Sequence, residues 1–321
     1  MYEFYLTKNG SVEREGNTIF FKGEGIKQSI PVLNLSEIIV TSKVSFSSWA
    51  LDYLSKLNIC VHFIRESGSY MSSLIPAGKN EIGNFTVKQA SCYLDSRRRL
   101  QIAAEMVRSI RSGILRNLRY YNKEGKLENA IERINSLKIK EDNIKSILGT
   151  EGNIWSEYYS SFPLIYKGQE SFKREFHPPK DPLNAMISFG NAILYSSTLT
   201  KIMTTGLNPS ISFLHEPSDR SFSLALDIAD MFKPMIVERI IAKIVNNRMI
   251  DKSEFREIKG GIYLNERGKK LFLQEYNDRI NSTVKIGNNY TSYGGLIRTE
   301  CIKLIKHIEG EEVYKSIKSW D

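Results

Sequence analysis

The spacing of hydrophobic residues divides the chain near residue 86. Before that point, short segments rich in β-branched and aromatic residues are separated by turn signals such as Asn9-Gly10 and Ser67-Gly68. We predict strands over residues 2–7, 18–22, 29–33, 37–40, 59–64 and 70–75. Apolar residues from Phe46 to Leu57 instead recur at helical spacing and predict one helix. This part of the chain therefore reads as a small β-sandwich or barrel-like module with a helical insert.

After residue 86 the hydrophobic period lengthens to that of an α-helix, and strand signals are few. We predict helices over residues 86–120, 126–147, 151–162, 182–205, 222–247, 266–281 and 291–309. A chain of 321 residues is long enough for about two domains. The expected fold class is α+β, with a small β-sandwich-like domain over residues 1–85 and a larger, mainly α-helical domain over residues 86–321.

The charge is divided between these two predicted domains. Residues 1–85 hold eight basic and eight acidic side chains, whereas residues 86–321 hold 37 basic and 28 acidic ones and carry the whole net charge of +9. A basic surface favours a polyanion such as DNA as the partner. We therefore expect the helical domain to bind DNA and the neutral β-rich domain to form the contact of a homodimer.

Cysteine content and hydropathy indicate where the protein works. Cys60, Cys92 and Cys301 are too few and too scattered for a disulfide framework or a cysteine-based zinc site. The first residues lack the basic and apolar regions of a signal peptide. The longest uncharged run, 182–200, contains seven Asn, Ser and Thr residues and is too polar for a membrane span. We expect a cytoplasmic protein that does not associate with membranes.

Two acidic residues lie within an apolar predicted helix. Asp227 and Asp230 are three residues apart and share one helix face, and His215 ends the apolar run that precedes this helix. Carboxylates among apolar neighbours are costly unless they pair with a base or bind a cation. Pairing with Arg or Lys and binding of a metal ion are both open at this point. Pro234 should bend the helix four residues after Asp230.

Two further features suggest a site but do not establish one. Glu151 lies at the start of a predicted helix, where an acid commonly acts as a cap or as a partner of the helix dipole. The predicted helix 182–205 has a polar but uncharged face that begins with Asn184. Such a face either lines a site, with Asn184 as a supporting residue, or packs against backbone carbonyls.

Basic residues form a stripe on the predicted helix 86–120. Its members, which fall within about 80° of one another around the helix, are Arg97, Arg108, Arg111 and Arg119. They span roughly 33 Å, close to one turn of DNA. A loop holds three further candidates for phosphate contacts, Arg174, His177 and Lys180. The stripe is either a phosphate-binding surface or a solvated helix face.

A set of ordered motifs resembles the integrase family of CRISPR adaptation, the universal endonuclease that inserts new spacers. The resemblance covers essentially the whole chain. The motifs that carry it are Glu151-Gly152-Asn153, His177-Pro178-Pro179-Lys180-Asp181-Pro182-Leu183-Asn184-Ala185, Ser188-Phe189-Gly190, Gly206-Leu207-Asn208-Pro209, Phe213-Leu214-His215, Ser223-Leu224-Ala225-Leu226-Asp227, Phe232-Lys233-Pro234 and Gly260-Gly261-Ile262-Tyr263-Leu264.

The resemblance implies a catalytic metal site. By motif its ligands fall on Glu151, His215 and Asp230, with Asp227 as the nearby acid that supports them. Two carboxylates and one imidazole suit Mn²⁺ or Mg²⁺. The chain differs from many members at two places, with Asp230 where they have Glu and with Phe176-His177 where they have arginines. Aspartate is shorter by one methylene but still ligates.

The resemblance also implies the reaction and the partners. A DNA 3′-hydroxyl would attack the leader–repeat boundary of a CRISPR array by metal-dependent transesterification. The same site would reverse that reaction and nick branched DNA. The protein would work as a homodimer with the small companion adaptation protein. Two other hypotheses remain, a stand-alone branched-DNA endonuclease and a non-enzymatic basic DNA-binding scaffold.

Overall fold

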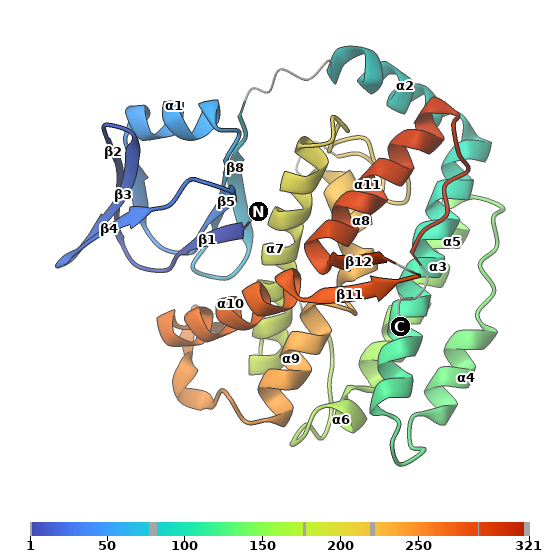
Figure 1. The fold of residues 1–321 in the computed structure, drawn as a ribbon. Helices are drawn as coiled ribbons and strands as arrows, with labels where there is room; N and C mark the ends of the chain where they lie inside the picture. The colour runs from blue at the N-terminus through green and yellow to red at the C-terminus, as the bar shows by residue number, and fades with distance from the viewer. Residues whose placement is uncertain (1, 77–81, 176–177, 219–221, 288, 318–321) are drawn as a thin grey trace. The chain divides into compact units, whose positions relative to one another are not determined.

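The computed structural model describes residues 2–76, 82–175, 178–218, 222–287 and 289–317 (Figure 1). The chain forms two compact units, each assembled from three segments. The β unit consists of Met1–Asn80, Phe176–Thr200 and Ile250–Asp278. The helical unit consists of Glu81–Glu175, Lys201–Met249 and Arg279–Asp321.

Two four-stranded sheets form the N-terminal part of the β unit. The first has the order β1 (Tyr2–Leu6), β5 (Leu35–Val40), β7 (Cys60–Ile64) and β8 (Tyr70–Leu74), and its first three strands are parallel. The second has the order β4 (Ile26–Ile30), β3 (Thr18–Gly23), β2 (Gly10–Glu15) and β6 (Val44–Phe46). Helix α1 (Ser48–Lys56) lies between β6 and β7 along the chain (Figure 1).

Apolar side chains from both sheets share one core. Val12 and Ile19 come from the second sheet, Ile38 and Val61 from the first, and all four are fully buried. Leu54 of α1 joins the same cluster. This arrangement confirms the predicted β-sandwich with a helical insert, although strands β2 and β6 were not predicted.

The β unit extends beyond the predicted boundary at residue 85 because later segments pack into it. Helix α7 (Pro182–Met203) ends its buried run at Thr200, whose Oγ1 lies 2.7 Å from His62 Nε2 and donates a hydrogen bond of 2.7 Å to Glu37 Oε2. Glu37 and His62 are fully buried. Because buried polar groups need hydrogen-bond partners, each of these three side chains depends on the others for its burial. A single cut at residue 85 therefore does not separate the two compact units.

The remainder of the β unit comes from a third segment. It contains the short helix η1 (Lys252–Glu254), the hairpin of β9 (Phe255–Ile258) with β10 (Gly261–Leu264), and most of α10 (Glu266–Asn281). The Lys269 ammonium on α10 donates to the Thr41 carbonyl at 3.2 Å and is almost fully buried. This contact joins α10 to the end of β5. Neither hairpin strand was predicted.

Helices dominate the helical unit, as predicted. In chain order they are α2 (Ile82–Leu94), α3 (Ser96–Tyr121), α4 (Glu128–Ser136), α5 (Ile144–Ser160), α6 (Phe162–Ile165), α8 (Ser223–Phe232), α9 (Val237–Asn246) and α11 (Tyr293–Glu309). Helix α3 packs against α4, α5 and α8 (Figure 1). A hairpin of β11 (Thr283–Ile286) and β12 (Asn289–Ser292) precedes α11.

Several of the predicted helices are shorter than expected because side chains and proline end them. The Asp95 carboxylate accepts from the backbone N–H groups of Arg97 and Arg98 and begins α3, so the predicted helix 86–120 is two helices. The predicted helix 222–247 is interrupted around Pro234, between α8 and α9. Glu151 lies in the middle of α5, which begins at Ile144, so it is not at a helix start.

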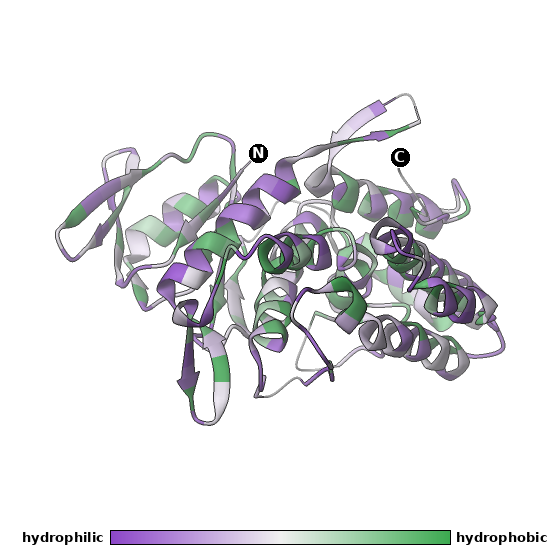
Figure 2. Cartoon of the chain, turned by 90° about the horizontal axis from the view of Figure 1, so that it is seen from below, coloured by the Kyte–Doolittle hydropathy of each residue, from purple (hydrophilic) through white to green (hydrophobic). Residues whose placement is uncertain are grey.

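Hydrophobic and hydrophilic residues are mixed along the helices (Figure 2). This mixing is expected where one helix face packs on a core and the other meets solvent. Within the described ranges, no helix combines the length and the apolar character needed to cross a membrane.

Candidate active site

Three predicted ligands lie in one part of the helical unit. Glu151 comes from α5, Asp230 from α8, and His215 from the segment that leads into α8. Their charges act on one another. Burial and, next, the Asp230 carboxylate raise the pKa of Glu151 to about 7, although His215 and Lys233 act in the opposite direction. The three side chains are therefore electrostatic neighbours although up to 79 residues separate them in sequence.

The Asp227 carboxylate organises the histidine segment. It is fully buried in α8, and its Oδ2 accepts from the backbone N–H groups of Phe213 at 2.7 Å and Leu214 at 2.9 Å. Its Oδ1 accepts from the His215 backbone N–H at 3.0 Å and lies 2.8 Å from His215 Nδ1. Because an ionised carboxylate can only accept, His215 Nδ1 carries a proton. In the neutral ring this leaves the Nε2 lone pair for a ligand.

The same contacts determine the charge of the histidine. Burial acts to lower the pKa of His215. The hydrogen bond and charge of Asp227, together with the charges of Asp230 and Glu151, outweigh burial and raise the pKa to about 9. The imidazole is thus cationic at neutral pH in this arrangement and partly offsets three carboxylates.

The ammonium of Lys233 adds a second positive charge beside these acidic residues. The Lys233 ammonium contacts Asp230 Oδ1 and lies 5.8 Å from the centroid of the Trp155 ring. Lys233 follows Asp230 by three residues in the chain, and Trp155 follows Glu151 by four residues on α5. The lysine therefore bridges the two elements that carry the acids. Its motif, Phe232-Lys233-Pro234, was visible in the sequence, and its spacing from Asp230 was the signal that could have identified it.

The donor set fits a hard divalent cation. Carboxylate oxygens with one imidazole nitrogen are suitable ligands for Mn²⁺ or Mg²⁺. Asp230 Oδ1 is buried, has no hydrogen-bond partner among the described residues and contacts the Lys233 ammonium. As the side chains stand in the described part of the chain, no three His, Cys, Asp or Glu residues are close enough together to hold a metal ion. Ligation by Glu151, His215 and Asp230 stays a prediction and requires side-chain rotation.

Asn184 occupies a local position at the start of α7. It is fully buried in the β unit, its backbone N–H donates to Asp181 Oδ1 at 2.8 Å, and its Nδ2 donates to Asp181 Oδ2 at 2.6 Å. These bonds stabilise the first turn of the helix. A supporting role of Asn184 at the acidic site remains a prediction.

The predicted arginine stripe on α3 is interrupted in its middle. Arg97 and Arg119 are exposed near the two ends of the helix. Arg108 instead pairs with Glu105 at 2.9 Å and also with Glu141. An arginine that already holds two carboxylates has little net charge to offer a phosphate. A DNA contact of Arg108 stays a prediction, and a phosphate would have to compete with these two carboxylates.

Arg111 is also engaged within the protein. It is partly buried, and its Nη1 donates to the Leu137 carbonyl at 2.9 Å. Burial lowers the pKa of Arg111, and Arg108 lowers it further. The segment after α4 thus covers the middle of α3 and takes both central arginines away from the predicted surface.

The three loop candidates are placed differently from one another. Arg174 is partly buried in the helical unit, where its Nη1 donates to the Glu175 carbonyl at 2.5 Å. Lys180 is exposed in the β unit, and its Nζ donates to the Gly260 carbonyl at 2.9 Å. His177 lies outside the described residues. Their contacts with DNA remain predictions.

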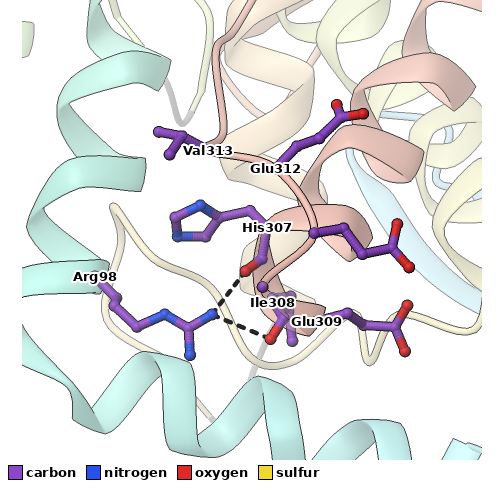
Figure 3. A pocket seen from close by; sticks show the side chains of 8 residues that line it. Arg98, His307, Ile308, Glu309, Glu312 and Val313 are labelled. Carbon is purple, nitrogen blue, oxygen red and sulfur yellow. Dashed lines mark hydrogen bonds between the residues drawn. The ribbon is translucent and has the colours of Figure 1, made fainter.

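A pocket of about 350 Å³ lies at the C-terminal end of α11 (Figure 3). Arg98 Nη2 donates to the carbonyls of His307 at 2.7 Å and Ile308 at 3.1 Å, and so caps the helix. Glu309, Glu311 and Glu312 also line it. None of the predicted catalytic or DNA-binding residues is among its lining residues. The acidic site described above is therefore a different feature.

Comparisons with known proteins show to which family the chain belongs. A family model described as "CRISPR associated protein Cas1" matches residues 4–278. The "CRISPR-associated endonuclease Cas1 3" of Thermodesulfovibrio yellowstonii is 38% identical over 325 residues, with 100% of both chains covered. The "CRISPR-associated endonuclease Cas1" of Clostridium perfringens is 38% identical over 326 residues, with 99% of both chains covered.

Solved structures share the fold. A CAS1 protein from Thermotoga maritima has a TM-score of 0.84 at 35% identity, covering 98% of this chain and 99% of that chain. A casposase bound to an integration product has a TM-score of 0.86 at 18% identity, covering 99% of this chain and 94% of that chain, which shows the fold alone. On the family match and the identity along the whole chain, this protein belongs to the CRISPR-associated Cas1 family.

Proposed function

We propose that the protein is a metal-dependent DNA integrase and endonuclease of CRISPR adaptation. The observation that carries the proposal is the cluster in the helical unit, in which the Glu151 and Asp230 carboxylates and the His215 imidazole act on one another and Asp227 holds the imidazole. The relatives' printed names, which describe CRISPR-associated endonucleases, support it. Membership of this family and the net charge of +9 both support DNA as the substrate.

Glu151, His215 and Asp230 are the residues that would hold a Mn²⁺ or Mg²⁺ ion. When bound, the ion would supply Lewis-acid activation of the scissile phosphodiester and stabilise the leaving oxygen. Asp227 fixes the tautomer and direction of the imidazole. Lys233 contacts Asp230 and lowers the pKa of Glu151, so its ammonium partly offsets the repulsion between the two carboxylates.

The reaction is a transesterification. The 3′-oxygen of an incoming spacer strand forms a bond to the phosphorus at the leader–repeat boundary, and the bond from that phosphorus to the array strand's 3′-oxygen breaks. The incoming hydroxyl loses a proton and the departing oxygen gains one, so no oxidant or energy source is needed. Water in place of the hydroxyl gives hydrolysis, which is the nicking activity.

Two partners complete the proposal. The chain acts as a homodimer through its β-rich part, whose side chains Leu33 and Trp49 are 81% and 74% exposed. It also acts with the small companion adaptation protein. The printed title of one structural neighbour, a "Cas6-RT-Cas1--Cas2 complex", names such an assembly, although that neighbour is 20% identical and shows the fold alone.

Strand transfer into a plasmid with a leader and repeat tests the proposal. The donor is a DNA with a 3′-hydroxyl, and a matched donor with a 3′-dideoxy end is the control. We expect joined product with Mn²⁺ and the companion protein, and none with the dideoxy donor or with EDTA. Nicking of branched DNA without joining, independent of the companion, would favour the stand-alone endonuclease. Binding without either activity would favour the scaffold.

A further inference from the structure

Arginine and tyrosine side chains alternate where α3 ends in the helical unit. The Arg239 guanidinium lies 3.8 Å from the centroid of the Tyr120 ring and 5.3 Å from that of Tyr121. The Arg279 guanidinium lies 4.1 Å from the centroid of the Tyr293 ring. We call these five residues the arginine–tyrosine cluster. They come from α3, α9, α10 and α11, which the chain brings together from distant positions.

Hydrogen bonds and a ring contact fix the position of the arginine–tyrosine cluster. Nε and Nη2 of Arg279 both donate to the Met235 carbonyl, at 3.0 Å and 2.7 Å. The rings of Tyr120 and Tyr121 meet edge to face, with centroids 4.9 Å apart. These contacts fix the ring and guanidinium planes before any partner arrives, which reduces the ordering cost of binding.

Positive charge accumulates around these rings. Burial lowers the pKa of Arg279, and the neighbouring Arg239 and Arg116 lower it further, because like charges repel. Arg119, which precedes Tyr120 in the chain, is exposed. Arg239, Arg279 and Arg116 thus lie close enough together to repel one another, and an anionic partner would relieve that repulsion.

Exposure separates Tyr120 from the rest of the cluster. Its side chain is 56% exposed, whereas Tyr293 is 5% exposed. Packing between helices explains why Tyr293, beside Arg279, is buried. It does not explain why more than half of the Tyr120 side chain is exposed to water. Arg239 covers one side of the Tyr120 ring and Tyr121 contacts it edge to face. The rest of an aromatic ring flanked by cations is a suitable surface for a stacked base.

We propose that the arginine–tyrosine cluster binds an unpaired nucleotide of a nucleic acid strand, with the base stacked on Tyr120 and the adjoining phosphates near Arg119 and Arg239. The inference rests on the proposed function only in taking nucleic acid as the ligand. It uses none of Glu151, His215 and Asp230, so binding can be tested without metal and without the reaction.

Fluorescence anisotropy in EDTA tests the stacking contact. The probes are a labelled single-stranded oligonucleotide and a blunt duplex of the same length. We expect Tyr120→Ala to weaken binding of the single strand by roughly 5- to 100-fold and to leave duplex binding within about twofold, since stacking contributes about 1–3 kcal/mol per base. Tyr120→Phe keeps the ring and should bind like the wild type. The matched control is Tyr290→Ala, at a tyrosine on β12 that is 70% exposed and lies outside the cluster.

Salt dependence tests the phosphate contacts. Arg119→Ala should reduce the slope of log affinity against log salt by about 0.7 on the single strand, and Tyr120→Ala should leave that slope unchanged. The proposal is overturned if Tyr120→Ala binds the single strand as the wild type does, if Tyr120→Phe loses as much as Tyr120→Ala, or if both probes weaken equally. A wild-type protein that fails in strand transfer would instead count against the proposed function alone.

Discussion

Asp227 Oδ1 lies 2.8 Å from His215 Nδ1, and the same carboxylate accepts three backbone N–H bonds from residues 213–215. One buried side chain therefore determines both the path of this segment and the orientation of its imidazole. A carboxylate behind a ligating histidine usually strengthens the ligand and fixes its tautomer. Loss of the Asp227 carboxylate should therefore disturb both the segment and the imidazole.

Asp227→Asn should damage the protein in two measurable ways. An amide has one accepting oxygen, so at least one of the buried N–H groups loses its partner, and the free energy of unfolding should fall by about 1–3 kcal/mol. The pKa of His215 should fall from about 9 because the partner charge is gone. Denaturant melts and an NMR titration of the histidine measure these effects. An unchanged His215 pKa in a folded variant would show that Asp227 does not control the ring.

Glu151 should make the metal-free protein less stable as the pH rises. Its pKa is about 7 in the folded protein against 4.5 for the free side chain, so between those values the unfolded chain loses a proton that the folded protein retains. The free energy of unfolding therefore falls as the pH rises from about 4.5 to about 7 and is level above. Glu151→Gln should remove this slope and raise stability at pH 8 by up to about 3 kcal/mol. Denaturant melts in EDTA at several pH values measure this slope for the wild type and for Glu151→Gln. Equal slopes in the two proteins would contradict a raised pKa of Glu151.

Lys233 should compete with a divalent cation for Asp230. Lys233→Met removes the ammonium that contacts the carboxylate, so we expect about tenfold tighter Mn²⁺ binding, a change of about 1.4 kcal/mol. The metal-free variant should be less stable than the wild type, because the buried Asp230 loses its cation. Calorimetric titration with Mn²⁺ measures the first effect and melts in EDTA the second. Lys243→Met, at an exposed lysine of α9, is the matched control. Weaker Mn²⁺ binding in Lys233→Met would mean that the lysine helps to assemble the site.

Two arginines of the same helix should respond in opposite ways. Arg119 is exposed, so Arg119→Ala should lower the salt slope of duplex binding by about 0.9 if it contacts one phosphate, with little effect on stability. Arg108→Ala removes the guanidinium that pairs with the largely buried Glu105 and leaves that carboxylate its contact with Ser316, so stability should fall by about 1–3 kcal/mol and the salt slope should be unchanged. A reduced salt slope for Arg108→Ala would restore the continuous arginine stripe predicted from the sequence.

The sequence predicted those structural features that depend on local residue patterns. Six of the eight N-terminal strands and the helical character of the later chain follow from the period of their apolar residues. His215, Asp227 and Asp230 are within 16 residues of one another, and the cost of burying charge indicated that they belong together. Strand β2 escaped prediction because Val12 is its only aliphatic residue and charged residues follow it.

Long-range contacts account for most of the rest. The β unit includes α7 up to Thr200, where Thr200 joins Glu37 and His62, and no local pattern indicates that pairing. Arg108 is neutralised partly by Glu141, 33 residues away, and helical spacing alone could not indicate that pairing. Glu151 lies in the middle of α5 and not at a helix start, because the helix continues through Gly149 and Thr150, although these are weak helix formers.

Strand transfer and DNA affinity, measured on the same samples of Glu151→Ala, test the central claim most directly. The matched control is Glu157→Ala, on the same helix, whose carboxylate pairs with Arg133 at 2.7 Å. We expect Glu151→Ala to lose Mn²⁺-dependent joining while it keeps most of its DNA affinity, because basic side chains supply that affinity, and we expect the control to retain both. Full Mn²⁺-dependent strand transfer by Glu151→Ala would contradict the account.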